Sequence, residues 1–171
     1  MQNNNSNEEQ FIELDIIEYN KDREKKGLPK IEIIPTTAEE IENINRFCIS
    51  FNHEGCLLSD AGEYEKAIEK YDIALFINPK YLDSLYNKGR ALHFLGQYGK
   101  AIELYDEVLK INPKHIVALH NKGMDLFLVE RYNEAIEVFD SVLKIDPSHA
   151  NAIHNKKIAL EKLIKYEEAI Q

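Results

Sequence analysis

The chain has 171 residues, of which 44% are hydrophobic, and a net charge of −9 at pH 7. This length fits one domain, or one short solenoid with an appendage, and so acidic a chain is a poor candidate for binding nucleic acid. It contains no apolar run of 18 residues and no basic-then-apolar leader, so we expect a cytoplasmic protein without a membrane span.

The first 47 residues differ in character from the rest. Residues 1–10 (MQNNNSNEEQ) are polar and low in complexity, which predicts a disordered tail. Residues 11–47 are predicted to form an N-terminal arm or cap. It comprises a short amphipathic helix with Phe11 and Ile16, an extended proline-bracketed stretch at 28–35, and the start of a long helix that a capping box at Thr37 opens.

The remainder of the chain is repetitive. Residues 82–115 recur as 116–149 with about half of the positions identical, and Pro79, Pro113 and Pro147 lie 34 residues apart. The same frame fits residues 48–81 more loosely and residues 150–171 until the chain stops. We therefore predict three full units, at 48–81, 82–115 and 116–149, and a partial fourth unit at 150–171.

Each unit reads as two helices. Leu85, Gly89 and Leu92 lie on one helical stripe, and a second stripe begins at Ala101 and is ended by the proline at 113. Gly89 and Ala101 are small where the two helices have to approach closely. The stripe of the first unit extends back to Ile41, so its first helix should be about ten residues longer than the others.

The repeated residues resemble the signature of the tetratricopeptide repeat family. Its places are filled by Leu85, Gly89, Leu92, Tyr98, Ala101, Tyr105, Val108 and Pro113, and again by Leu119, Gly123, Leu126, Tyr132, Ala135, Phe139, Val142 and Pro147. The resemblance implies an all-α fold, a right-handed superhelical solenoid of antiparallel helix pairs that carries the N-terminal appendage. Lysines replace the family's usual leucine at 88, 122 and 156, where a lysine stem can cover apolar surface.

Nothing in the sequence indicates catalysis. Cys48 and Cys56 are eight residues apart on one predicted helix, about 12 Å, which is too far for a disulfide, so we expect reduced thiols. The repeat-equivalent histidine pairs, His115/His149 and His120/His154, are one helix pair apart, which is too far to share a metal ion. We expect no enzyme activity, no cofactor and no metal.

The resemblance also implies that the first helix of each unit lines a concave groove. The residues predicted to bind a partner there are Tyr86, Asn87, Arg90, His93, His120, Asn121, Met124, Phe127, His154 and Asn155. An apolar wall of this kind marks a protein or peptide site. Two other interpretations stay open: residues 11–35 of the same chain cover the wall, or the wall packs against neighbouring helices.

Family members that clamp the C-terminal carboxylate of heat-shock chaperones use lysine, arginine and asparagine at five groove places. Those places hold Asn52, Cys56, Asn87, Val117 and Asn121, or, one unit later, Tyr86, Arg90, Asn121, Asn151 and Asn155. Only the asparagines match, which disfavours such a clamp.

The predicted function is therefore a protein–protein interaction module that binds a peptide or helix of a partner. The alternatives are a targeting arm truncated from a larger enzyme or signalling protein, and a self-assembling scaffold. A homo-dimer could form through the open C-terminal face or the N-terminal arm. The stop at Gln171 falls inside an expected second helix, which suggests truncation.

Overall fold

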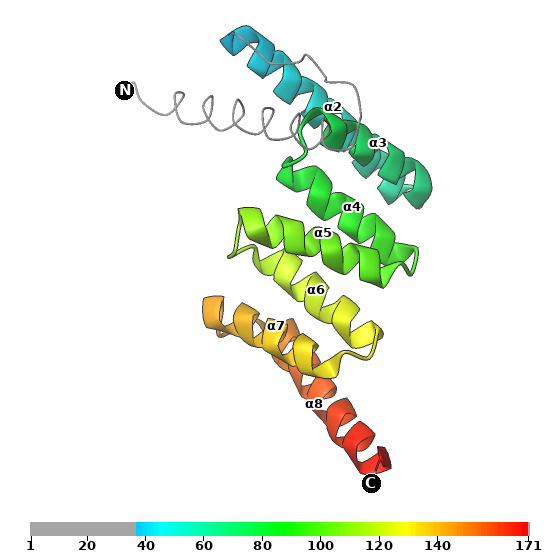
Figure 1. Cartoon of the computed structure of the whole chain (residues 1–171), viewed down its shortest axis with the longest axis vertical. Coiled ribbons are helices and arrows are strands. Elements are labelled where there is room, and N and C mark those ends of the chain that lie inside the picture. Colours follow the sequence, from blue (N-terminus) through cyan, green and yellow to red (C-terminus); the bar gives the residue numbers. More distant parts are fainter. Residues whose placement is uncertain (1–36, 171) are drawn as a thin grey trace, which may run out of the picture.

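The computed structural model describes residues 37–170, which form seven helices and no strand (Figure 1). The predicted tail and most of the predicted arm lie outside these residues. The helices are α2 (Ala38–Asp60), α3 (Tyr64–Ile77), α4 (Leu82–Phe94), α5 (Tyr98–Ile111), α6 (Ile116–Leu128), α7 (Tyr132–Ile145) and α8 (Ala150–Ile170). As predicted, the first helix of the first unit is longer than the next, with 23 residues in α2 and 13 in α4.

The helices stack as consecutive pairs along the long axis of the molecule (Figure 1). Each helix packs against the next one in the chain. The first helices α2, α4, α6 and α8 also contact one another in turn, whereas α3, α5 and α7 make no such contact within the described range. The stack is therefore more closely packed on the side of the first helices. The predicted all-α solenoid is confirmed.

The end of each second helix follows from proline chemistry. Asn78, Asn112 and Asp146 each precede a proline and adopt extended backbone angles, with φ of −132°, −129° and −129°. Proline forces this region on the residue before it, because its ring clashes with a helical neighbour. The 34-residue spacing of the prolines thus becomes a regular spacing of helix ends.

The turn inside each pair needs one residue in the left-handed region. Gly62 (φ 79°), Gly96 (φ 71°) and Glu130 (φ 61°) supply it in the three full units. Ile164 holds the equivalent place in the fourth unit, and a β-branched residue is strongly disfavoured there. The expected break near this residue is therefore wrong: α8 continues as one helix from Ala150 to Ile170.

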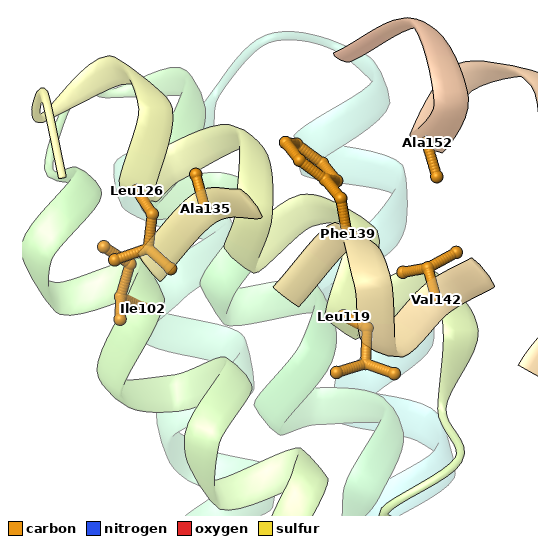
Figure 2. Close-up of a cluster of buried hydrophobic side chains, with 7 residues drawn as sticks. All are labelled: Ile102, Leu119, Leu126, Ala135, Phe139, Val142 and Ala152. Atoms are coloured by element: carbon orange, nitrogen blue, oxygen red, sulfur yellow. The ribbon is translucent and has the colours of Figure 1, made fainter. Parts of the chain in front are cut away.

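A glycine and an aromatic ring meet where the two helices of each pair are closest. A Cβ atom added to Gly89 would lie 2.7 Å from the Tyr105 ring, and one added to Gly123 would lie 2.6 Å from the Phe139 ring. Tyr105 and Phe139 are fully buried. Figure 2 shows Phe139 among the apolar side chains that α5, α6, α7 and α8 contribute to one core cluster. The predicted close approach at the glycines is confirmed.

One lysine–aspartate ion pair joins each of the last three units to the unit before it. Lys88 binds Asp72 at 2.5 Å, Lys122 binds Asp106 at 2.5 Å, and Lys156 binds Asp140 at 2.6 Å. These are the lysines that replace the family's leucine. Their side chains are only 20–29% exposed, so their stems lie against the helices as expected, but their amines reach a carboxylate of the preceding unit rather than water alone.

Replacing Gly123 with alanine tests the close approach. We expect Gly123→Ala to lower the free energy of unfolding by about 1–3 kcal/mol, because the buried Phe139 ring has no free space to move into. The matched control is Gly99→Ala, also within a helix but with nothing within 4 Å of an added Cβ, which should raise stability by about 0.5–1 kcal/mol. Equal effects of the two changes in urea unfolding would contradict this account.

A double-mutant cycle on Lys122 and Asp106 tests the ion pairs. Because the pair is partly exposed, we expect a coupling energy of about 0.5–1 kcal/mol that shrinks in 1 M salt. Lys122→Ala alone should cost more than Asp106→Ala alone, since it also removes the packed stem. A coupling energy that does not change with salt would exclude an electrostatic origin.

Candidate partner-binding groove

The first helices present one continuous side to solvent, here called the inner face. It is formed by the side chains of α2, α4, α6 and α8 that flank the buried stripe and stay exposed or half-buried. Large apolar side chains are exposed along it: Ile49 is 57% exposed, Phe94 53%, Val117 51% and Leu128 42%, although the Phe94 ring also stacks on that of Tyr64 in α3 at 5.0 Å. Apolar groups in such a row offer a binding surface, because covering them removes them from water.

Tyr86 and Arg90 occupy the middle of the inner face. The Tyr86 hydroxyl accepts a hydrogen bond of 3.2 Å from the Asn121 amide of the next unit, and the Tyr86 ring lies 5.3 Å from that of His115. The Arg90 guanidinium carbon is 6.0 Å from the centre of the Tyr86 ring. Burial raises the pKa of Tyr86, so the ring stays neutral and its hydroxyl can both accept and donate.

Asparagines at the same place in each unit join neighbouring first helices. The Asn87 amide donates to Asn52 Oδ1 at 3.1 Å and to Cys56 Sγ at 3.4 Å. The Asn155 amide lies 2.9 Å from Met124 Sδ. With the Asn121–Tyr86 bond, these contacts form a ladder across three successive junctions, so the asparagines hold the inner face in shape.

A buried acid lies behind the inner face. Asp125 is fully buried at the place that Ala91 and Ala159 hold in the neighbouring units. Its Oδ1 is paired with His93 Nδ1, and its Oδ2 has no hydrogen-bond partner. Burial raises the pKa of Asp125, and the His93 contact opposes that rise. The sequence reasoning missed this residue, although an acid at an alanine position was a visible signal.

Two histidines meet at the junction of α6 and α8. The His120 ring lies 5.3 Å from the His149 ring and 5.9 Å from the Phe139 ring. His149 Nδ1 accepts the backbone N–H of Ala152 at 3.2 Å, while His120 Nδ1 is buried without a partner. Burial lowers the pKa of His120, and the nearby His149 lowers it further.

Nine of the ten predicted site residues are half-buried on the inner side, and His154 is exposed. Met124, Phe127 and Tyr86 pack against the core clusters, so part of their apolar surface is already used within the fold. The ten predicted site residues do not include Phe94, Val117 and Leu128, whose apolar side chains are more exposed than those of Tyr86, Met124 and Phe127. Burial depends on how far a side chain leans toward its neighbours, which helical spacing does not resolve.

The described part of the chain offers no other chemistry on this face. It holds no group of three or more histidine, cysteine or acidic side chains placed to bind a metal ion. None of its helices is both long and apolar enough to cross a membrane. A cleft of about 540 Å³ lies on the opposite side, between α3 and α5, over Ile68, Leu92 and Leu104.

Solved structures with a similar arrangement include tetratricopeptide repeat domains. The first such domain of Spaghetti (RPAP3), bound to the HSP90 peptide SRMEEVD, is 18% identical with a TM-score of 0.67, over 70% of this chain and 94% of that one. The Sgt2 domain from Aspergillus fumigatus is 23% identical with a TM-score of 0.66, over 72% and 83%. A MamA RS-1 double mutant is 27% identical with a TM-score of 0.66, over 72% and 69%.

A search of curated proteins found no match. Two family models do match the sequence, one over residues 82–115 and one over residues 116–149, and both describe the tetratricopeptide repeat. The helix pairs, the glycine–aromatic contacts and the matched models agree, and residues 82–149 are two repeats of the tetratricopeptide repeat family.

Proposed function

We propose that this protein binds a segment of another protein along its inner face and carries out no catalysis. The observation that carries the proposal is the exposure of the apolar side chains Phe94, Val117 and Leu128 on first helices, one of which also carries the cation of Arg90. Two domains of similar fold support the proposal, because the RPAP3 domain is bound to an HSP90 peptide and the yeast Sti1 domain is in a complex with pHsp70.

The ligand we favour has apolar side chains and an acid, and does not depend on a free C-terminus. Three of the five places used by carboxylate clamps, Asn52, Cys56 and Asn87, are hydrogen-bonded to one another, and a fourth is the apolar Val117. None of these four side chains can supply a positive charge. Arg90 can pair with an acidic side chain of the ligand, because its fork of donors fits a carboxylate.

The ladder of asparagines favours binding without rearrangement. Asn87, Asn121 and Asn155 fix the spacing of the first helices before any ligand arrives. A surface held in its bound shape loses less conformational entropy on association.

The same proposal includes a cytoplasmic location for the protein. In that compartment Cys48 and Cys56 would stay as free thiols. Burial raises the pKa of Cys48 to about 11, so its thiol stays protonated.

Self-assembly is a second candidate, favoured by one observation on α8. Ile153 is 50% exposed and Leu160 is 40% exposed, while the equivalent leucines of the two preceding units are 1–7% exposed. An apolar stripe left bare on a long helix can pair with another copy. The third alternative, a targeting arm of a larger enzyme, is supported by no observation on the described residues.

Binding to peptides selected from a random display library tests the inner face. We expect Val117→Asp to weaken binding by about ten- to a hundredfold, since it replaces an apolar contact with a charge. The control Ile111→Asp changes a similarly exposed side chain (42%) on the second helix α5 and should leave affinity unchanged. Amidating the C-terminus of the peptide should also have no effect.

Equal loss of binding in the Val117 and Ile111 variants would sink the inner-face assignment. A large loss on amidation of the peptide would instead reinstate a carboxylate clamp. Arg90→Gln should reduce affinity only for selected peptides that contain an aspartate or a glutamate. Peptides in which that acid is replaced by asparagine or glutamine should bind the variant and the wild type equally.

The buried His120 makes the stability of this face depend on pH. Because its pKa is lowered in the folded state, the unfolded chain binds its proton first as pH falls below about 6.5. We therefore expect the free energy of unfolding to fall with pH from 7 toward 5 less steeply in His120→Tyr than in the wild type. The raised pKa of Asp125 acts in the opposite sense in both proteins and cancels in the comparison. Parallel pH profiles in urea unfolding would refute the role of His120.

A further inference from the structure

The side of α2 that faces the N-terminal end of the stack carries large exposed apolar side chains. The corresponding side of α4, α6 and α8 carries small buried residues instead. In α4, α6 and α8 the matching stripe packs on the second helix of the preceding unit through small, fully buried residues such as Ser84, Ala118 and Ala152. In α2 the stripe consists of Phe47, Ser50, Glu54 and Leu57, here called the entry face. Phe47 is 58% exposed and Leu57 is 57% exposed. The entry face therefore presents large apolar groups with nothing described against them.

The charge on the entry face is inverted relative to every other junction. The other three junctions place a lysine on the first helix and an aspartate on the preceding second helix. α2 has Glu54 at the lysine place, where it binds Lys70 of its own unit at 2.7 Å. A further unit of the same type would bring its aspartate toward Glu54, and like charges repel. The entry face is thus suited to an apolar segment that carries positive charge.

Residues 11–26 of the same chain combine an apolar pattern with a basic C-terminal end. Their predicted helix has Phe11, Ile12, Ile16 and Tyr19 toward one side. The segment as a whole holds five acids and four bases, and its positive excess lies in residues 21–26, which hold four bases and two acids. These residues lie outside the part of the chain that the structure describes. Among the first 36 residues, this is the segment that combines a helical apolar pattern with a cluster of cations.

The connection between the two is long enough. A stretch of eight residues, the length of 28–35, can span up to about 26 Å when fully extended, and the helix from Ala38 to Leu57 rises about 28 Å. The segment can therefore turn back and run along the whole entry face. Tethering through so short a link gives an effective concentration in the millimolar range, which favours the chain's own segment over a second copy.

We propose that residues 11–26 dock on the entry face of α2 in the same molecule and close the N-terminal end of the solenoid. Phe47 and Leu57 bury the apolar side of the segment, and Glu54 faces its basic residues. The inner face stays open to a partner under this arrangement.

Amide hydrogen exchange of the full chain, read by mass spectrometry on peptides from residues 11–26, tests the proposal. We expect exchange in this segment to be at least about tenfold slower in the wild type than in the double variant Phe47→Asp, Leu57→Asp. The matched control, Ile49→Asp with Val117→Asp, changes two inner-face side chains of similar exposure (57% and 51%) and should keep the protection. The exposed positions leave the core intact, which circular dichroism of each variant would verify.

Three results would overturn the proposal. The segment could exchange as fast in the wild type as in the entry-face variant. Its protection could be lost in the inner-face control instead, which would place the segment in the groove. Protection could rise with protein concentration together with the molecular mass from light scattering, which would make the occupant a second copy. A separate variant, Glu54→Lys, should speed exchange several-fold, and no change would remove the charge pairing from the account.

Discussion

Everything else in this structure depends on the contact between one glycine and one aromatic ring in each helix pair. Gly55 with Tyr71, Gly89 with Tyr105, and Gly123 with Phe139 let the two backbones approach until the ring edge fills the space of a Cβ atom. Packed interiors tolerate little change in volume, so this contact sets the distance between the helices. Repeating the same pair three times then fixes how each unit meets the next, and thereby the course of the inner face.

That inner face combines two kinds of surface with different tasks. Its polar side chains are used within the fold, where the Asn121 amide donates to Tyr86 and the Asn87 amide donates to Asn52. Its apolar side chains, such as Phe94 and Val117, are exposed. Exposed apolar side chains on a hydrogen-bonded backbone of fixed shape can contact a ligand without rearranging, which limits the conformational entropy lost on binding.

The repeat in the sequence was enough to predict the fold, because glycine, alanine and proline each report a local requirement of the backbone. The same spacing predicted the longer α2. Features that depend on three-dimensional neighbours were not predictable: the aspartates that receive the three lysines lie sixteen residues away, and Asp125 reaches a histidine of another unit. The continuous α8 was missed for a different reason. The repeat frame predicts a turn at Ile164, but an isoleucine does not readily adopt the left-handed backbone angles that Gly96 adopts at the same place, so the helix continues.

The three lysine–aspartate junctions also make the units interchangeable. At every junction between two units, the later unit contributes a lysine and the earlier unit contributes an aspartate at the same repeat positions. A duplicated copy of residues 82–149 would meet a complementary charge at both of its ends. If residues 82–149 were removed, Lys156 would face Asp72 in the same way. The array could therefore lengthen or shorten by whole units during evolution, or by design, while every junction keeps its lysine–aspartate pair.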